Sequence, residues 1–113
     1  MTAKEYLWRV RDAEQELRQL EMEYKQARDD MLHLKAIEYD KERVSTSRIG
    51  DLSDAIAALE RYAEEVNAQW DRLIALRKAA KVLIGRVPDG RYRAILQGRY
   101  LYGQSWEQVA VGL

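Results

Sequence analysis

The stretch AKEYLWRVRDAEQELRQLEMEYKQARDDMLHL (residues 3–34) decides the fold, because apolar residues recur along it in alternating steps of three and four. Every member of this series is apolar: Ala3, Tyr6, Val10, Ala13, Leu17, Leu20, Tyr24, Ala27, Met31 and Leu34. Such a heptad spacing is typical of a long helix that packs along one seam against a second helix. We therefore predict a first helix over about residues 2–43.

The segment VSTSRIGD (residues 44–51) then interrupts the pattern with two serines and Gly50, and Asp51 is suited to cap a following helix. From Leu52 the spacing resumes as far as Ile84, with Arg77 as its one polar member. This predicts a linker over 44–51 and a second helix over about 52–84. Two such helices joined by a short linker are expected to form an antiparallel coiled-coil hairpin. The predicted seam contains Val10, Leu17, Leu20, Tyr24, Met31, Leu34, Leu52, Ile56, Leu59, Val66, Trp70 and Leu73.

The end of the second helix carries more apolar residues than a two-helix seam can cover. The surplus consists of Leu73, Ile74, Leu76, Ala79, Val82, Leu83 and Ile84. The C-terminal helices, a second copy of the chain, or both are expected to cover it. Oligomer or docking contacts are accordingly predicted at Leu7, Trp8, Leu76 and Leu83.

Turn signals divide the rest of the chain into two short helices. Gly85 is suited to end the second helix, and Pro88-Asp89-Gly90 marks a turn. A third helix is predicted over about 91–102, ended by Gly103. Ser105 and Gln108 form a capping-box pattern that begins a fourth helix, in which we expect Trp106 to pack into the core. The chain is thus predicted to be all-α, with a hairpin over 1–86 and a small module over 87–113.

Composition excludes several classes of protein. The 113 residues include no cysteine, which fits a reducing compartment, and no apolar run is long enough to cross a membrane. The single histidine, His33, has Asp29 and Asp30 nearby but too few other ligands for a metal site. No phosphate-binding glycine loop or nucleophile–base pair is evident. We expect a cytoplasmic protein that is not an enzyme and takes no cofactor, metal or small-molecule substrate.

Charge is distributed unevenly, although the net charge is zero. Residues 1–60 hold ten Lys and Arg against fourteen Asp and Glu, whereas residues 61–113 hold nine against five. The basic second half makes phosphate contacts with DNA a hypothesis for Arg86, Arg91, Arg93 and Arg99. The alternative is that these side chains solvate helix faces and pair with the acidic first half.

The closing residues RYLYGQSWEQVAVGL (99–113) resemble region four of bacterial sigma factors, in which an R-Y motif and a glycine turn lead into the first helix of a helix-turn-helix. The whole chain is similar to small phage and prophage proteins related to the ArpU and RinA-like late-gene regulators. The matching residues are Met1 to Leu7, Pro88, Arg91, Tyr92, Arg93, Arg99, Tyr100, Leu101, Gly103, Ser105, Trp106, Glu107, Val109, Ala110 and Leu113. The family pattern continues with a base-reading helix, whereas this sequence ends at Leu113. Two alternatives follow: either the natural protein continues past Leu113, or this member acts through protein contacts.

The resemblance implies a phage or prophage transcription regulator that acts through DNA or RNA polymerase, with oligomerisation through the coiled coil and a dimer favoured. The alternative is a helical-hairpin protein–protein interaction module that does not bind DNA.

Overall fold

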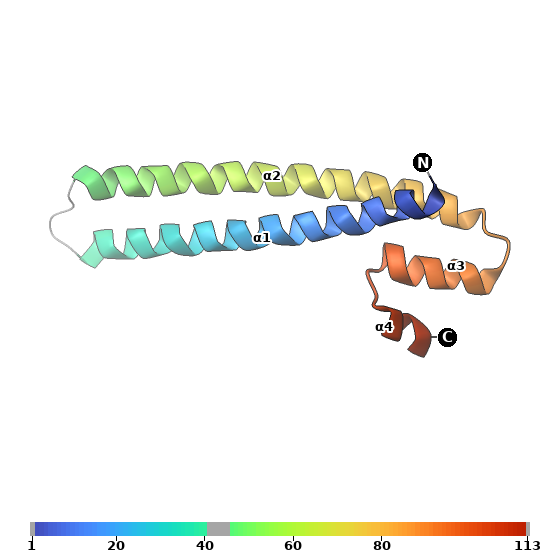
Figure 1. The fold of residues 1–113 in the computed structure, drawn as a ribbon. Coiled ribbons are helices and arrows are strands. Elements are labelled where there is room, and N and C mark those ends of the chain that lie inside the picture. The colour runs from blue at the N-terminus through green and yellow to red at the C-terminus, as the bar shows by residue number, and fades with distance from the viewer. Residues whose placement is uncertain (1, 41–45, 113) are drawn as a thin grey trace. The chain divides into compact units, whose positions relative to one another are not determined.

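The computed structural model describes residues 2–40 and 46–112, which form helices and no strands. Helix α1 (Ala3–Asp40) packs against α2 (Thr46–Gly85) as a hairpin, and short helices follow (Figure 1). The predicted all-α class and hairpin are confirmed. No described helix has a long and apolar enough stretch to span a bilayer.

Helix α1 begins with a capping box. The backbone N–H of Glu5 donates to the Thr2 hydroxyl (3.2 Å), and the N–H of Thr2 donates to the Glu5 carboxylate (3.3 Å). The start predicted near residue 2 is therefore correct. The predicted end near residue 43 lies outside the described residues.

Helix α2 begins at Thr46 rather than at Leu52, so the predicted linker is wrong for residues 46–51. Gly50 and Asp51 lie inside the helix, and Asp51 does not cap it. One helical glycine costs only about 1 kcal/mol relative to alanine, which a helix this long can absorb through its packing. Helix α2 ends at Gly85, as predicted to within one residue, but Gly85 is its last helical residue and does not have a positive φ.

Contacts divide the chain into two units. We call residues 1–16 and 70–113 the head unit and residues 17–69 the hairpin unit. This division differs from the expected one after residue 86, because the C-terminal helices belong to the same unit as the first turns of α1 and the last turns of α2.

The head unit has a well-buried apolar core. Val10, Leu73 and Ala80 have no exposed surface. The other buried core residues of this unit are Leu7, Ala13, Ile84, Tyr100 and Val109. Since Tyr100 and Val109 come from the C-terminal helices, these helices supply part of the cover that the apolar end of α2 required.

The hairpin unit is less completely buried, and Leu17 is its one fully buried side chain among the described residues. The predicted α1 seam residues Leu20, Tyr24, Met31 and Leu34 are half-buried. On α2 the half-buried positions include Leu52, Ala55, Leu59, Tyr62, Val66 and Gln69. Counted from Leu52, the observed seam on α2 advances first by three residues and then by four. The predicted seam advanced from the same residue first by four and then by three.

This difference moves two predicted seam residues to the edge of the interface. Ile56 is 42% exposed and Trp70 is 38% exposed. Both registers share Leu52, Leu59 and Val66, so the sequence pattern fits either one. A shift of one residue rotates a position by about 100° around the helix, which is enough to bring it out of a two-helix seam.

The module after Pro88 contains three helical segments: α3 (Gly90–Leu96), the π-helical η1 (Gln97–Leu101) and α4 (Trp106–Val111). The Asp89 carboxylate caps α3 by accepting from the backbone N–H groups of Arg91 (2.8 Å) and Tyr92 (3.4 Å). The third helix predicted over 91–102 is thus present, but its second half is wound as a π-helix. The predicted Ser105–Gln108 capping box at α4 is confirmed.

Candidate functional site

A glycine with a left-handed conformation forms the turn between η1 and α4. Gly103 has a φ of 66°, a left-handed conformation that L side chains adopt at a cost. A Cβ added at Gly103 would lie 2.9 Å from Glu14 Oε1 on α1. The left-handed backbone conformation favours glycine at this position, and an added Cβ would also require the Glu14 carboxylate, at the end of a flexible side chain, to move.

The Arg99 side chain connects the two sides of this turn. Its Nη1 donates to the backbone carbonyl of Gln104 (3.2 Å), and its guanidinium carbon lies 4.7 Å from the centre of the Trp106 ring. The Arg99 Nε is buried and has no hydrogen-bond partner within the described part of the chain. Through this hydrogen bond and the contact with the Trp106 ring, Arg99 connects η1 to α4.

Helix α1 contacts the same module. Arg11 Nη1 donates to the carbonyl of Arg99 (3.0 Å), and the Trp8 ring meets Tyr100 edge-on with 6.2 Å between the ring centres. The Arg11 guanidinium also lies 5.7 Å from the centre of the Trp8 ring. Trp8 thus serves as a docking residue for η1, one of the two roles predicted for it, although it is still 40% exposed.

The other predicted contact residues are covered to different degrees. Leu7 is 5% exposed, so it belongs to the core of the head unit. Leu76 and Leu83 are half-buried. Trp106, which we expected in the core, is 54% exposed, because it lies beneath the Arg99 guanidinium instead of packing inward. Val109 is the buried residue of α4.

The four arginines predicted to contact phosphates fall into two pairs. Arg93 donates to the carbonyls of Val87 (3.0 Å) and Pro88 (3.5 Å), and Arg99 is engaged as described. In contrast, Arg86 and Arg91 are exposed, and neither side chain forms an ion pair or hydrogen bond with any described residue. Arg86 and Arg91 flank the turn from α2 into α3, where their charge is available to a partner.

A groove in the head unit lies beside this module, with a volume of about 290 Å³. Its lining residues come from α2, η1 and the residue after η1: Ile74, Arg77, Lys78, Lys81, Gln97, Leu101 and Tyr102. Arg77, Lys78 and Lys81 belong to the basic second half of the sequence. The groove itself was not predicted, because Ile74 and Tyr102 meet only when the C-terminal module folds back onto α2.

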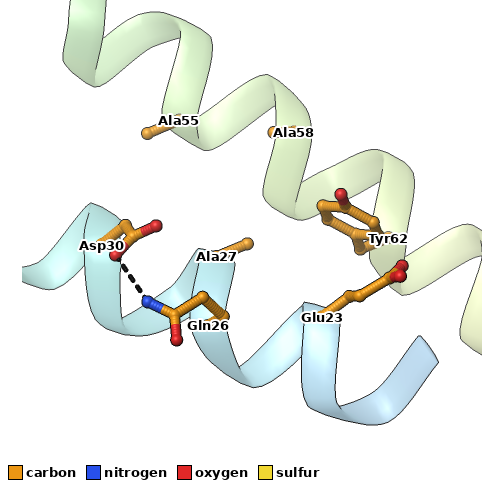
Figure 2. Close-up of a pocket in the computed structure, with 7 residues that line it drawn as sticks. All are labelled: Glu23, Gln26, Ala27, Asp30, Ala55, Ala58 and Tyr62. Atoms are coloured by element: carbon orange, nitrogen blue, oxygen red, sulfur yellow. Dashed lines mark hydrogen bonds between the residues drawn. The ribbon is translucent and has the colours of Figure 1, made fainter. Parts of the chain in front are cut away.

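A second groove lies in the hairpin unit, between α1 and α2, with a volume of about 270 Å³ (Figure 2). Its floor is made by Ala27, Ala55 and Ala58, whose small side chains leave the space open. Figure 2 shows Glu23 beside Tyr62 at one end and Asp30 at the other, where Asp30 accepts a hydrogen bond from Gln26 Nε2 (3.0 Å).

No group of side chains typical of a metal site occurs in the described residues. Three or more His, Asp or Glu side chains do not converge anywhere in this part of the chain. Acidic and basic groups instead form exposed pairs such as Arg72–Glu16 (3.8 Å) and the less exposed Arg77–Glu14 (3.9 Å).

Comparison with known protein families, curated proteins and solved structures finds no match to this chain.

Proposed function

We propose that this chain is a transcription regulator of the phage or prophage type, which contacts DNA or RNA polymerase with its head unit and self-associates through its hairpin unit. The observation that carries the proposal is the pair Arg86 and Arg91, both exposed and unpaired among the described residues, at the turn into the C-terminal module. Guanidinium groups match the geometry of phosphate oxygens, so this turn is suited to the DNA backbone.

The local structure of the module supports the resemblance to a helix-turn-helix. A helical segment ends at Leu101, Gly103 makes a left-handed turn, and Ser105 caps a short helix whose Val109 is buried. In helix-turn-helix proteins the first helix positions the motif on the backbone. Within this module, Arg93 and Arg99 hold the fold, which leaves phosphate contact to Arg86 and Arg91.

Titration of duplex DNA at several salt concentrations tests the proposal. Each phosphate contact contributes about 0.9 to the slope of log affinity against log salt. We expect the Arg86→Gln/Arg91→Gln variant to weaken binding and to reduce this slope by about 2. The matched control is Arg28→Gln/Arg61→Gln, which changes the charge equally on exposed residues of the hairpin unit.

Two results would count against DNA contact at this turn. One is an affinity that does not depend on salt, both for residues 1–113 and for the reading frame continued past Leu113. The other is an equal loss of affinity in the test and control variants, because that would indicate a diffuse effect of charge.

Self-association is proposed to occur through the apolar surface that the hairpin unit leaves exposed. Met22, Leu32 and Ile56 are 73%, 51% and 42% exposed, and the alanine floor of the groove permits close approach of another helix. Two such hairpins forming a four-helix bundle would bury these residues. Light scattering is expected to give a dimer, and Ile56→Glu is expected to dissociate it, whereas Ala57→Glu, also at an exposed position, should not.

The second candidate is a helical-hairpin interaction module that does not bind nucleic acid. It is favoured by the engagement of Arg93 and Arg99 with backbone carbonyls, which removes half of the predicted phosphate contacts. An oligomer that captures no DNA at low salt would select this candidate over the first.

A further inference from the structure

The groove of the head unit combines an apolar floor with a basic rim, and neither feature is used by the proposed DNA contact. Ile74 and Tyr102 are 43% and 69% exposed, although both line the groove. Exposed apolar residues gathered at one hollow, with polar residues around them, mark a site of interaction more often than a plain surface does.

Charge indicates which partner suits this groove. Arg77, Lys78 and Lys81 line it, and no acidic residue does. Arg77 is partly offset by Glu14 at 3.9 Å, but Lys78 and Lys81 are exposed and have no ion pair with any described residue. The rim therefore presents at least two free positive charges, one turn apart on α2, beside the apolar floor.

We infer that this groove binds an acidic amphipathic helix of a partner protein. Apolar side chains of that helix would occupy the space over Ile74, Leu101 and Tyr102, and its carboxylates would face Lys78 and Lys81. A volume of about 290 Å³ accommodates a few apolar side chains, and helix-in-groove recognition uses anchors spaced three or four residues apart. The apolar floor distinguishes the groove from a site that binds the nucleic-acid backbone, where polar contacts to phosphates dominate.

This inference rests on the groove alone and holds whether or not the chain binds DNA. Its test uses a fluorescent synthetic peptide with leucine at every third and fourth position and glutamate on the remaining face. A peptide in which lysine replaces each glutamate is the matched probe. We expect residues 1–113 to bind the glutamate peptide with an affinity that falls as salt rises, and to bind the lysine peptide much more weakly.

Variants of the chain locate the binding site. The Lys78→Glu/Lys81→Glu variant should have an affinity for the glutamate peptide that is lower by on the order of tenfold or more, since each change places like charges together. The control Lys4→Glu/Lys35→Glu makes the same change in charge at exposed positions away from the groove. Ile74→Ala should weaken binding without altering the salt dependence. Circular dichroism establishes that each variant remains folded.

Three results would overturn the inference: no binding of the glutamate peptide, equal binding of both peptides, or equal losses in the groove and control variants. A fourth is a change of mass in light scattering when Lys78 and Lys81 are replaced, with peptide binding unchanged. That outcome would assign the groove to a second copy of this chain.

Discussion

The guanidinium of Arg99 lies over the ring of Trp106, with 4.7 Å between the guanidinium carbon and the ring centre. The same side chain donates a hydrogen bond to the carbonyl of Gln104 between them. One residue of η1 thus closes the turn that leads to α4. This explains why an arginine and a tryptophan seven residues apart serve the fold of the module, although a sequence pattern suggests a DNA contact and a core residue.

Replacing Arg99 by alanine should destabilise the chain by about 1–2 kcal/mol, through loss of one hydrogen bond and one cation–π contact. Arg99→Lys should recover only part of this stability, because an ammonium group cannot stack as a planar guanidinium does. Arg91→Ala is the control, since Arg91 is exposed and unpaired among the described residues. Urea unfolding followed by circular dichroism measures the differences; equal stability of Arg99→Ala and Arg91→Ala would contradict this role.

The Gly103→Ala change should also destabilise the head unit. A left-handed conformation costs an L residue about 1–2 kcal/mol, and the new Cβ would push against the Glu14 carboxylate. Gly50→Ala makes the same chemical change inside α2, where nothing lies within 4 Å of the added atom. We expect this control to raise stability by up to about 1 kcal/mol. The midpoint of thermal unfolding should therefore fall for Gly103→Ala and rise for Gly50→Ala. Shifts of the same sign in the two variants would contradict the left-handed turn at Gly103.

Two neighbouring residues on α2 distinguish the core from the groove. Leu73 has no exposed surface, whereas Ile74 is 43% exposed. Leu73→Ala should cost about 2–5 kcal/mol, the range found for large-to-small changes in protein cores. Ile74→Ala should cost well under half as much. Comparable losses of unfolding free energy in the two variants would show that the head unit packs differently.

The cap of α4 provides a smaller test. The Ser105 hydroxyl accepts from the N–H of Gln108 (3.2 Å), and the Gln108 side chain accepts from the N–H of Ser105 (2.9 Å). Ser105→Ala should lower stability by about 1 kcal/mol. Ser53→Ala, at an exposed position inside α2, should have almost no effect or a slightly positive one. A loss of equal size at both positions would argue against the capping box.

The sequence was sufficient to predict the helices that carry long or well-marked patterns. The heptad of α1, the Ser105 cap and the glycine turn at Gly103 are local signals, and each predicted its element correctly. The start of α2 was missed, because Ser, Thr and Gly50 are also tolerated in a helix that gains its stability from packing. The register of α2 was missed because Leu52, Leu59 and Val66 fit both spacings.

The candidate sites were harder to predict than the fold. Which arginines are free depends on backbone carbonyls that approach Arg93 and Arg99 only in the folded module. The groove over Ile74 depends on residues of η1 that lie more than twenty positions away along the chain. No local signal in the sequence joins residues so far apart, and for the same reason Trp106 was predicted to lie in the core.

Photo-crosslinking to duplex DNA tests the central claim, that the turn between α2 and α3 faces nucleic acid, most directly. A photoreactive residue in place of Tyr92, which is 60% exposed between Arg91 and Arg93, should crosslink to DNA and lose its crosslinks as salt is raised. The same residue in place of Gln19, an exposed position of the hairpin unit, should give none. Equal labelling from both positions, or labelling from position 19 alone, would contradict the account.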